Sequence, residues 1–199
     1  MDCRTHETQP AARPIALVVE RDAELVCLVA GGDRHAFEVL YRSYFPRLTR
    51  FLQRMTRSAP LIEEIVNDVM LVVWQKADTF DGSCKVSTWV FAIAYRRACK
   101  MLHRLDDPLE SFPDALAGEA DCQPEQRFEQ LCLAHALGAA LDALPLSQRA
   151  AFQLAFYHDM SCAEIAEIMD CPVNTVKTRL FHARRRLALL FEGQLEGRP

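Results

Sequence analysis

The sequence predicts an all-α protein built from two small helical domains that are joined by a flexible acidic linker. Apolar residues recur every three to four positions over most of the chain, which is the period of an amphipathic helix. The 199 residues include only seven glycines and 9% aromatic residues, which disfavours an all-β sandwich. An acidic, proline-containing stretch separates the two periodic parts.

The expected domain boundaries follow the changes in composition. Between residues 105 and 127 there are three prolines, one glycine and several carboxylates opposed by a single basic residue, Arg127, and this composition is typical of a linker. We therefore expect an N-terminal tail over 1–21, a first domain over 22–104, the linker over 105–127, a second domain over 128–193 and a C-terminal tail over 194–199.

In the first domain, helical periodicity begins at Asp22, and Gly31–Gly32 ends the first helix. Asp33 is expected to be the N-cap of the second helix. Pro46 is expected near the start of a further helical run, which Ser58–Pro60 ends with a turn.

Two long helices follow. The first begins near Leu61 and continues to Trp74, and the second spans about Ser87–His103. The turn-forming residues Asp78–Ser83 predict a loop between them. Arg96, Arg97 and Lys100 are expected on the exposed arc of the second helix.

The second domain begins with a helix from Phe128 toward Pro145, and a further helix follows over about 147–158. The segment 161–180 then has the pattern of a helix-turn-helix, with helices near Cys162–Met169 and Asn174–Leu190. Asp170 tolerates the left-handed backbone that the turn needs. Asn174 or Thr175 is expected to cap the second of these helices.

The exposed side of the second helix carries the residues that we expect to contact duplex DNA. Val176 and Leu180 face inward, which leaves the N-terminal end of the helix for base edges and a later run of arginines for phosphates. The expected residues are Asn174, Thr175, Lys177, Thr178, Arg179, Arg184, Arg185 and Arg186. A plain helical hairpin with a solvated basic face is the simpler alternative.

The distribution of charge supports nucleic-acid binding, although the net charge is −4. Every charged residue from Lys85 to Arg104, and again from Pro172 to Phe191, is basic. Two basic blocks therefore flank the acidic linker, and the net charge conceals them.

Other classes of protein find little support. The eight cysteines include no C-x-x-C pair, and no H-E-x-x-H pattern occurs, so we expect no metal site and mostly buried, structural cysteines. We also expect no catalytic residues and no cofactor, because no nucleotide loop or nucleophile constellation is present. The longest apolar run, Val69–Trp74, is far too short to span a bilayer, which predicts a cytoplasmic protein without membrane insertion.

Four segments, in order, resemble the extracytoplasmic-function (ECF) sigma factors of bacterial RNA polymerase. Leu141–Arg149 and the helix-turn-helix segment through Leu187 resemble their region four. Ala36–Tyr44 and Glu63–Trp74 resemble the opening and the core-binding helix of region two, and Phe80–Arg97 contains motifs similar to its promoter-melting part.

The resemblance implies a non-catalytic protein whose partners are core RNA polymerase, promoter DNA and an anti-sigma factor. The clamp helices of the largest polymerase subunit would dock on Glu63, Glu64, Asn67, Asp68 and Leu71. The minus-10 element, with flipped bases, would contact Phe80, Asp81, Ser83, Lys85, Arg96, Arg97 and Lys100, and region four would read the minus-35 element. The acidic linker would run through the polymerase channels.

Two other functions remain possible from the residues alone. A stand-alone helix-turn-helix regulator would need only the second domain and leaves residues 22–104 unexplained. A helical protein-interaction module without DNA binding predicts a neutral face over Lys177–Arg186, which is not what the sequence contains. Trp74 and Trp89 are interpreted as core residues rather than base-stacking residues.

Overall fold

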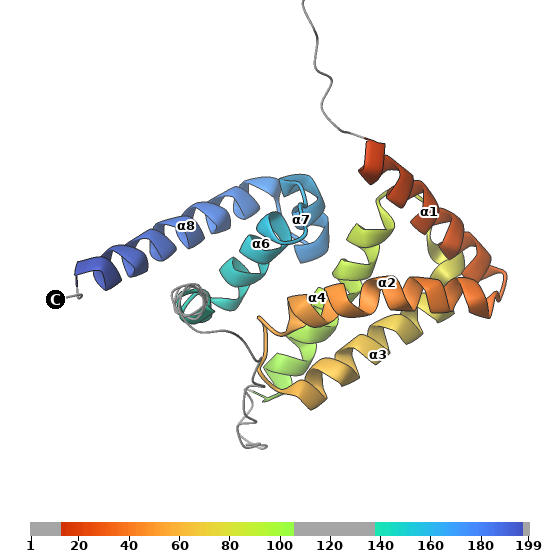
Figure 1. Cartoon of the computed structure of the whole chain (residues 1–199), viewed down its shortest axis with the longest axis horizontal. Coiled ribbons are helices and arrows are strands. Elements are labelled where there is room, and N and C mark those ends of the chain that lie inside the picture. Colours follow the sequence, from red (N-terminus) through yellow and green to blue (C-terminus); the bar gives the residue numbers. More distant parts are fainter. Residues whose placement is uncertain (1–12, 106–137, 197–199) are drawn as a thin grey trace, which may run out of the picture.

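The computed structural model describes residues 13–105 and 138–196, which form two groups of helices (Figure 1). The first group contains α1 (Arg13–Ala30), α2 (Arg34–Leu52), α3 (Ala59–Lys76), the 3₁₀ helix η1 (Ala77–Thr79) and α4 (Val86–Leu105). The second contains the helical residues 138–142, followed by α6 (Leu146–Phe156), α7 (Cys162–Met169) and α8 (Val173–Glu196). No strand occurs in these two ranges, which confirms the all-α prediction.

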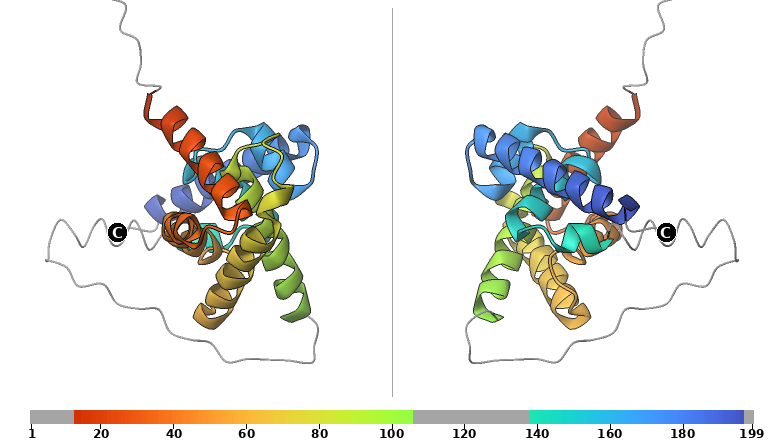
Figure 2. Two further views of the ribbon diagram at one scale, coloured as in Figure 1. Left: turned by 90° about the vertical axis from the view of Figure 1, so that its right-hand side faces the viewer. Right: turned by 90° about the vertical axis from the view of Figure 1, so that its left-hand side faces the viewer.

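The N-terminal bundle is organised around α3 and α4. These helices run antiparallel, and they cross and then diverge away from the loop that connects them (Figure 2). Ile65, Val69 and Val73 on α3 are fully buried, as are Val90 and Phe91 on α4. The apolar side chains that the 3.6-residue period of both helices places on one face therefore form the core, as predicted.

Helix α1 extends into the stretch that the sequence analysis assigns to a tail. It begins at Arg13, whereas residues 1–12, and most of the expected linker, lie outside the described residues. Asp22, at the expected domain boundary, is buried within this helix, so the first domain includes residues before 22.

The prediction of a separate helical run near Pro46 was wrong, because α2 is continuous through this residue. Proline in a helix interior removes one backbone hydrogen bond. Tyr44 and Leu48 flank Pro46 and lie on the same face of α2, and both side chains are fully buried. Their burial offsets the lost hydrogen bond. The predicted N-cap is confirmed: the Asp33 side chain accepts hydrogen bonds from the backbone N–H groups of His35 and Ala36.

A buried hydrogen bond joins α1 to α2. The Tyr44 hydroxyl donates to Asp22 Oδ2 over 2.6 Å, and both residues are buried. Burial, and then the Asp22 carboxylate, raise the pKa of Tyr44 well above its ordinary value, so the hydroxyl remains a donor at neutral pH.

Replacing Tyr44 with phenylalanine is expected to lower the free energy of unfolding by about 1–3 kcal/mol, because the buried Asp22 carboxylate loses its donor. Urea denaturation followed by circular dichroism measures this loss. Tyr41→Phe is the matched control, since the Tyr41 hydroxyl bonds Asn67 over 3.2 Å at an exposed position. Equal losses for the two variants would contradict a special role for the buried pair.

The two groups of helices pack against one another. In Figure 1, α6, α7 and α8 lie together on one side of the N-terminal bundle, and α7 packs against α4. A single apolar core continues from Leu40 and Phe91 to Leu154, Ile165 and Ile168, while a smaller one joins Leu141 and Leu144 to Ala183 and Leu187. None of the helices in the described ranges is long and apolar enough to cross a membrane.

Candidate nucleic-acid and polymerase interfaces

Helices α7 and α8 form the predicted helix-turn-helix. Ser161 caps α7 in a reciprocal capping box, in which its side chain accepts from the Glu164 N–H and its own N–H donates to Glu164 Oε2 over 2.8 Å. Asp170 ends α7 in the left-handed conformation at φ 49°, as predicted. Val176 and Leu180 are buried, so the inward face of α8 is also as expected.

The prediction that Asn174 or Thr175 caps α8 was wrong. The helix already begins at Val173, and the carbonyl of Pro172 accepts the N–H groups of Thr175 and Val176. Asn174 and Thr175 therefore lie inside the first turn, where their side chains are not needed as caps. Asn174 is exposed and available for contact with a ligand, while Thr175 is half-buried.

The predicted duplex-binding side chains lie along α8, and most of them are exposed. Lys177, Thr178, Arg185 and Arg186 are exposed. Arg179 is half-buried, and its Nη1 donates to Cys171 Sγ over 3.3 Å and to Met169 Sδ over 3.8 Å. The guanidinium of Arg184, further along the helix, lies 5.1 Å from the centre of the Phe156 ring.

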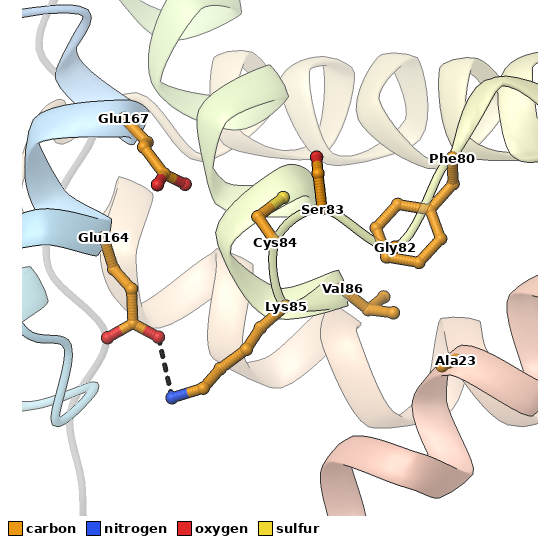
Figure 3. Close-up of a pocket in the computed structure, with 9 residues that line it drawn as sticks. All are labelled: Ala23, Phe80, Gly82, Ser83, Cys84, Lys85, Val86, Glu164 and Glu167. Atoms are coloured by element: carbon orange, nitrogen blue, oxygen red, sulfur yellow. Dashed lines mark ion pairs between the residues drawn. The ribbon is translucent and has the colours of Figure 1, made fainter.

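The predicted loop between α3 and α4 borders a cavity of about 410 Å³ (Figure 3). The cavity is lined by Phe80, Gly82, Ser83, Cys84, Lys85 and Val86 of the loop and the start of α4, by Ala23 of α1, and by Glu164 and Glu167 of α7. The Phe80 ring packs on Trp89, with centroids 5.3 Å apart. Hydrogen bonds from Ser83 hold the pKa of the Asp81 carboxyl below its ordinary value and fix the turn.

The predicted basic residues of α4 differ in their surroundings. Arg96 and Lys100 are exposed, whereas the half-buried Arg97 lies with its Nη1 3.5 Å from Asp68 Oδ2 on α3. The structure thus pairs a residue expected to contact DNA with one expected to contact polymerase. Tyr95, on the same helix, is half-buried, and burial raises the pKa of its hydroxyl.

The predicted polymerase-binding residues share one face of α3. Glu63, Glu64, Asn67 and Leu71 are exposed, and the apolar side chain of Leu71 is 51% accessible. Asp68 is half-buried beside Arg97.

Aromatic residues of α2 extend this face, and they were missed by the sequence analysis. Tyr41 bonds Asn67 and stacks on Phe45, with centroids 5.5 Å apart, and Phe45 is 36% exposed. The spacing of Phe37, Tyr41 and Phe45, four residues apart, was the signal that places them on one side of a helix.

The cysteines differ from the expectation of buried, structural thiols. Of the five in the described ranges, Cys27 is exposed, and Cys84, Cys99, Cys162 and Cys171 are half-buried. Cys99, Cys162 and Cys171 pack against the apolar core without being fully enclosed by it. Within residues 13–105 and 138–196 there is no group of three or more His, Cys, Asp or Glu that is suited to a metal ion.

Comparisons with known proteins match both domains. The family model for sigma-70 region 2 matches residues 40–107, and the one for sigma-70 region 4 matches residues 134–187. The ECF RNA polymerase sigma factor RpoE of Cereibacter sphaeroides is 35% identical over 158 residues, covering 78% of this chain and 86% of that protein. The ECF sigma factor SigM of Mycobacterium tuberculosis is 32% identical over 174 residues, covering 85% and 84%.

Two solved structures share the fold. CnrH, in complex with the cytosolic domain of CnrY, has a TM-score of 0.66 at 22% identity, covering 87% of this chain and 98% of that one. RpoE of Bartonella quintana, in complex with the anti-sigma factor NepR, has a TM-score of 0.61 at 24% identity, covering 78% and 96%. With both regions matched in order and relatives matched over most of their length, the chain belongs to the ECF sigma factors of the sigma-70 family and directs the initiation of transcription.

Proposed function

We propose that this sigma factor binds core RNA polymerase through α3, reads the minus-35 element as duplex with α8, and captures the minus-10 element with the loop 80–86 and α4. The protein itself performs no catalysis, and its place of action is the cytoplasm, where the polymerase is. The clamp helices of the largest polymerase subunit are the partner of the α3 face. The observation that carries the proposal is the capped helix-turn-helix with an exposed basic recognition helix.

The minus-35 assignment is supported by the geometry of α7 and α8. The turn at Asp170 leads directly into the first two turns of α8, in which Lys177 and Thr178 are exposed. A recognition helix inserts its N-terminal residues into the major groove, where long basic side chains bond guanine edges.

The minus-10 assignment is supported by the loop cavity. A flipped base needs an aromatic or apolar wall and a nearby cation for the adjoining phosphate. Phe80 supplies the wall, and Lys85 supplies the cation. Arg96 and Lys100 continue the positive charge along α4.

The polymerase assignment is supported by the exposure of Leu71 beside carboxylates. Leu71 is half accessible, and Glu64 and Asn67 on the same helix are also exposed. An apolar side chain among polar ones is typical of the apolar centre and polar rim of a protein interface.

Purification of the chain with core polymerase, followed by run-off transcription from genomic fragments, tests the proposal. Stoichiometric binding and new start sites are expected, and they would give the promoter sequence. A chain that binds DNA but never binds core polymerase would instead be a stand-alone regulator.

Arg179→Ala is expected to weaken promoter-specific binding of the holoenzyme by about ten- to a hundredfold, because a base contact is worth roughly 1–3 kcal/mol. Arg185→Ala is the matched control, and it should weaken binding to all sequences about equally and reduce the salt slope by about one. Fluorescence anisotropy on the promoter and on a scrambled duplex measures both effects. Unchanged promoter discrimination in Arg179→Ala would remove this residue from the recognition surface.

An anti-sigma factor is part of the same proposal. The RpoE structure with NepR shows a protein of this fold in complex with such an inhibitor. Affinity purification of this chain from its host, followed by mass spectrometry, should recover an inhibitor as well as polymerase subunits.

A further inference from the structure

We propose that the free chain is autoinhibited by a contact between its two domains, in which Glu164 of α7 takes the place of DNA phosphate on Lys85 of the minus-10 loop. This inference rests on the proposed function of that loop. It adds a regulatory role for α7, which is otherwise only the support of the recognition helix.

The contact lies at the mouth of the loop cavity. In Figure 3, α7 faces the loop, and the carboxyl groups of Glu164 and Glu167 point toward the side that carries Lys85, Cys84 and Ser83. Lys85 Nζ lies 2.7 Å from Glu164 Oε1. The Glu164 carboxylate of the second domain thus pairs with the Lys85 ammonium group, which in the first domain is the proposed contact for a nucleic-acid phosphate.

Glu164 is held firmly in this position. Its Oε2 accepts the Ser161 N–H in the capping box, while its Oε1 faces Lys85, so both oxygens are engaged. The side chain is only 17% exposed. Burial alone would raise the pKa of Glu164, but the hydrogen bonds from Lys85 and Ser161 outweigh it and lower the pKa, which keeps the carboxylate charged.

One residue of the recognition helix lies near the contact between the domains. Arg179 bonds Cys171 within the helix-turn-helix, and its positive charge reaches Tyr95 on α4, where it opposes the rise in the tyrosine pKa. Because α7 and α4 pack directly together, the minus-10 loop faces the helix-turn-helix in the closed chain, whereas Lys177 and Thr178 of α8 are exposed. The minus-10 loop is therefore not fully available until the domains separate.

The closed arrangement is incompatible with a bound promoter. The minus-35 and minus-10 elements lie about two turns of duplex apart, which is roughly 70 Å. Lys85 and Glu164 are in direct contact, so the chain cannot bind both elements without opening. Any free energy that stabilises the closed form therefore reduces the free energy of promoter binding by the same amount.

Glu164→Gln tests the contact in the full-length chain. Glutamine keeps the capping box but removes the charge, so the fold should remain intact. Hydrogen exchange of the amides of residues 83–86 is expected to become about fivefold faster, the factor that a partly exposed ion pair can supply. The affinity of the free chain for the single-stranded minus-10 segment, identified by run-off transcription, should rise by a similar factor.

Glu167→Gln is the matched control, because it removes the same charge one turn along α7 from a residue that is exposed. It should leave both measurements nearly unchanged. Unaltered exchange in Glu164→Gln would overturn the contact, and faster exchange with unaltered DNA affinity would overturn autoinhibition. Hydrogen exchange reports closure whether or not the chain is active with polymerase, so failure of the proposed function appears separately, in run-off transcription by the wild type.

Discussion

Replacing Arg149 with methionine is expected to lower the free energy of unfolding by about 2–4 kcal/mol, since the guanidinium donates hydrogen bonds to three backbone carbonyls and links the two domains. Its Nη2 donates to the carbonyl oxygens of Asp142 and Leu144 over 2.6 and 3.0 Å. Its Nη1 donates to the carbonyl of Arg54, in the other domain, over 2.9 Å. The side chain is 17% exposed, so water replaces these bonds poorly.

Arg57→Met is the control for this variant. Arg57 Nη2 contacts Asp142 Oδ2 over 2.6 Å, but its side chain is 78% exposed, and we expect a loss below about 1 kcal/mol. Urea denaturation of both variants measures the difference. A similar, small loss for the two would show that the Arg149 carbonyl bonds add little to stability.

The local features of the fold could be predicted because short stretches of sequence determine them. The apolar period of Leu61–Trp74 gives α3, and Asp33 starts α2 by capping it with its own side chain. Asp170 could be assigned to the left-handed turn because few other residues tolerate it. These determinants lie within about four residues of the atoms that they bind.

The remaining features depend on contacts between distant residues. Pro46 predicts a break by local rules, but packing of α2 against α1 and α3 overrides it. Local pattern assigns Asp22 to a domain boundary, but its hydrogen bond from Tyr44 holds it in the interior. Likewise, the DNA-facing residues of each domain were assigned from local pattern, whereas the pairing of Lys85 with Glu164 joins positions in different domains and has no periodicity that reveals it.

Acidification is expected to destabilise the closed form through His158, which lies where the two domains meet. Its ring packs on Phe91 and Phe51, with centroids 4.5 and 6.1 Å away. Burial, followed by the charges of Arg47 and Arg50, lowers the pKa of His158 from 6.5 to about 4, while Asp159 opposes the shift. The neutral ring is therefore favoured in the folded protein, and the unfolded chain binds the proton more readily.

The resulting stability is fully present above pH 6.5 and is lost as the pH falls from 6.5 to about 4, by about 3 kcal/mol in total. Urea denaturation between pH 7 and pH 4 should show this slope in the wild type and a shallower one in His158→Phe, which keeps the aromatic packing without the proton. His35→Phe removes a histidine whose side chain is 86% exposed, and it should retain the slope of the wild type. Since carboxylates titrate in the same range in all three proteins, the difference in slope isolates His158. Identical slopes of unfolding free energy against pH in all three proteins would contradict the prediction. The contact between the domains would then tolerate a protonated His158 ring.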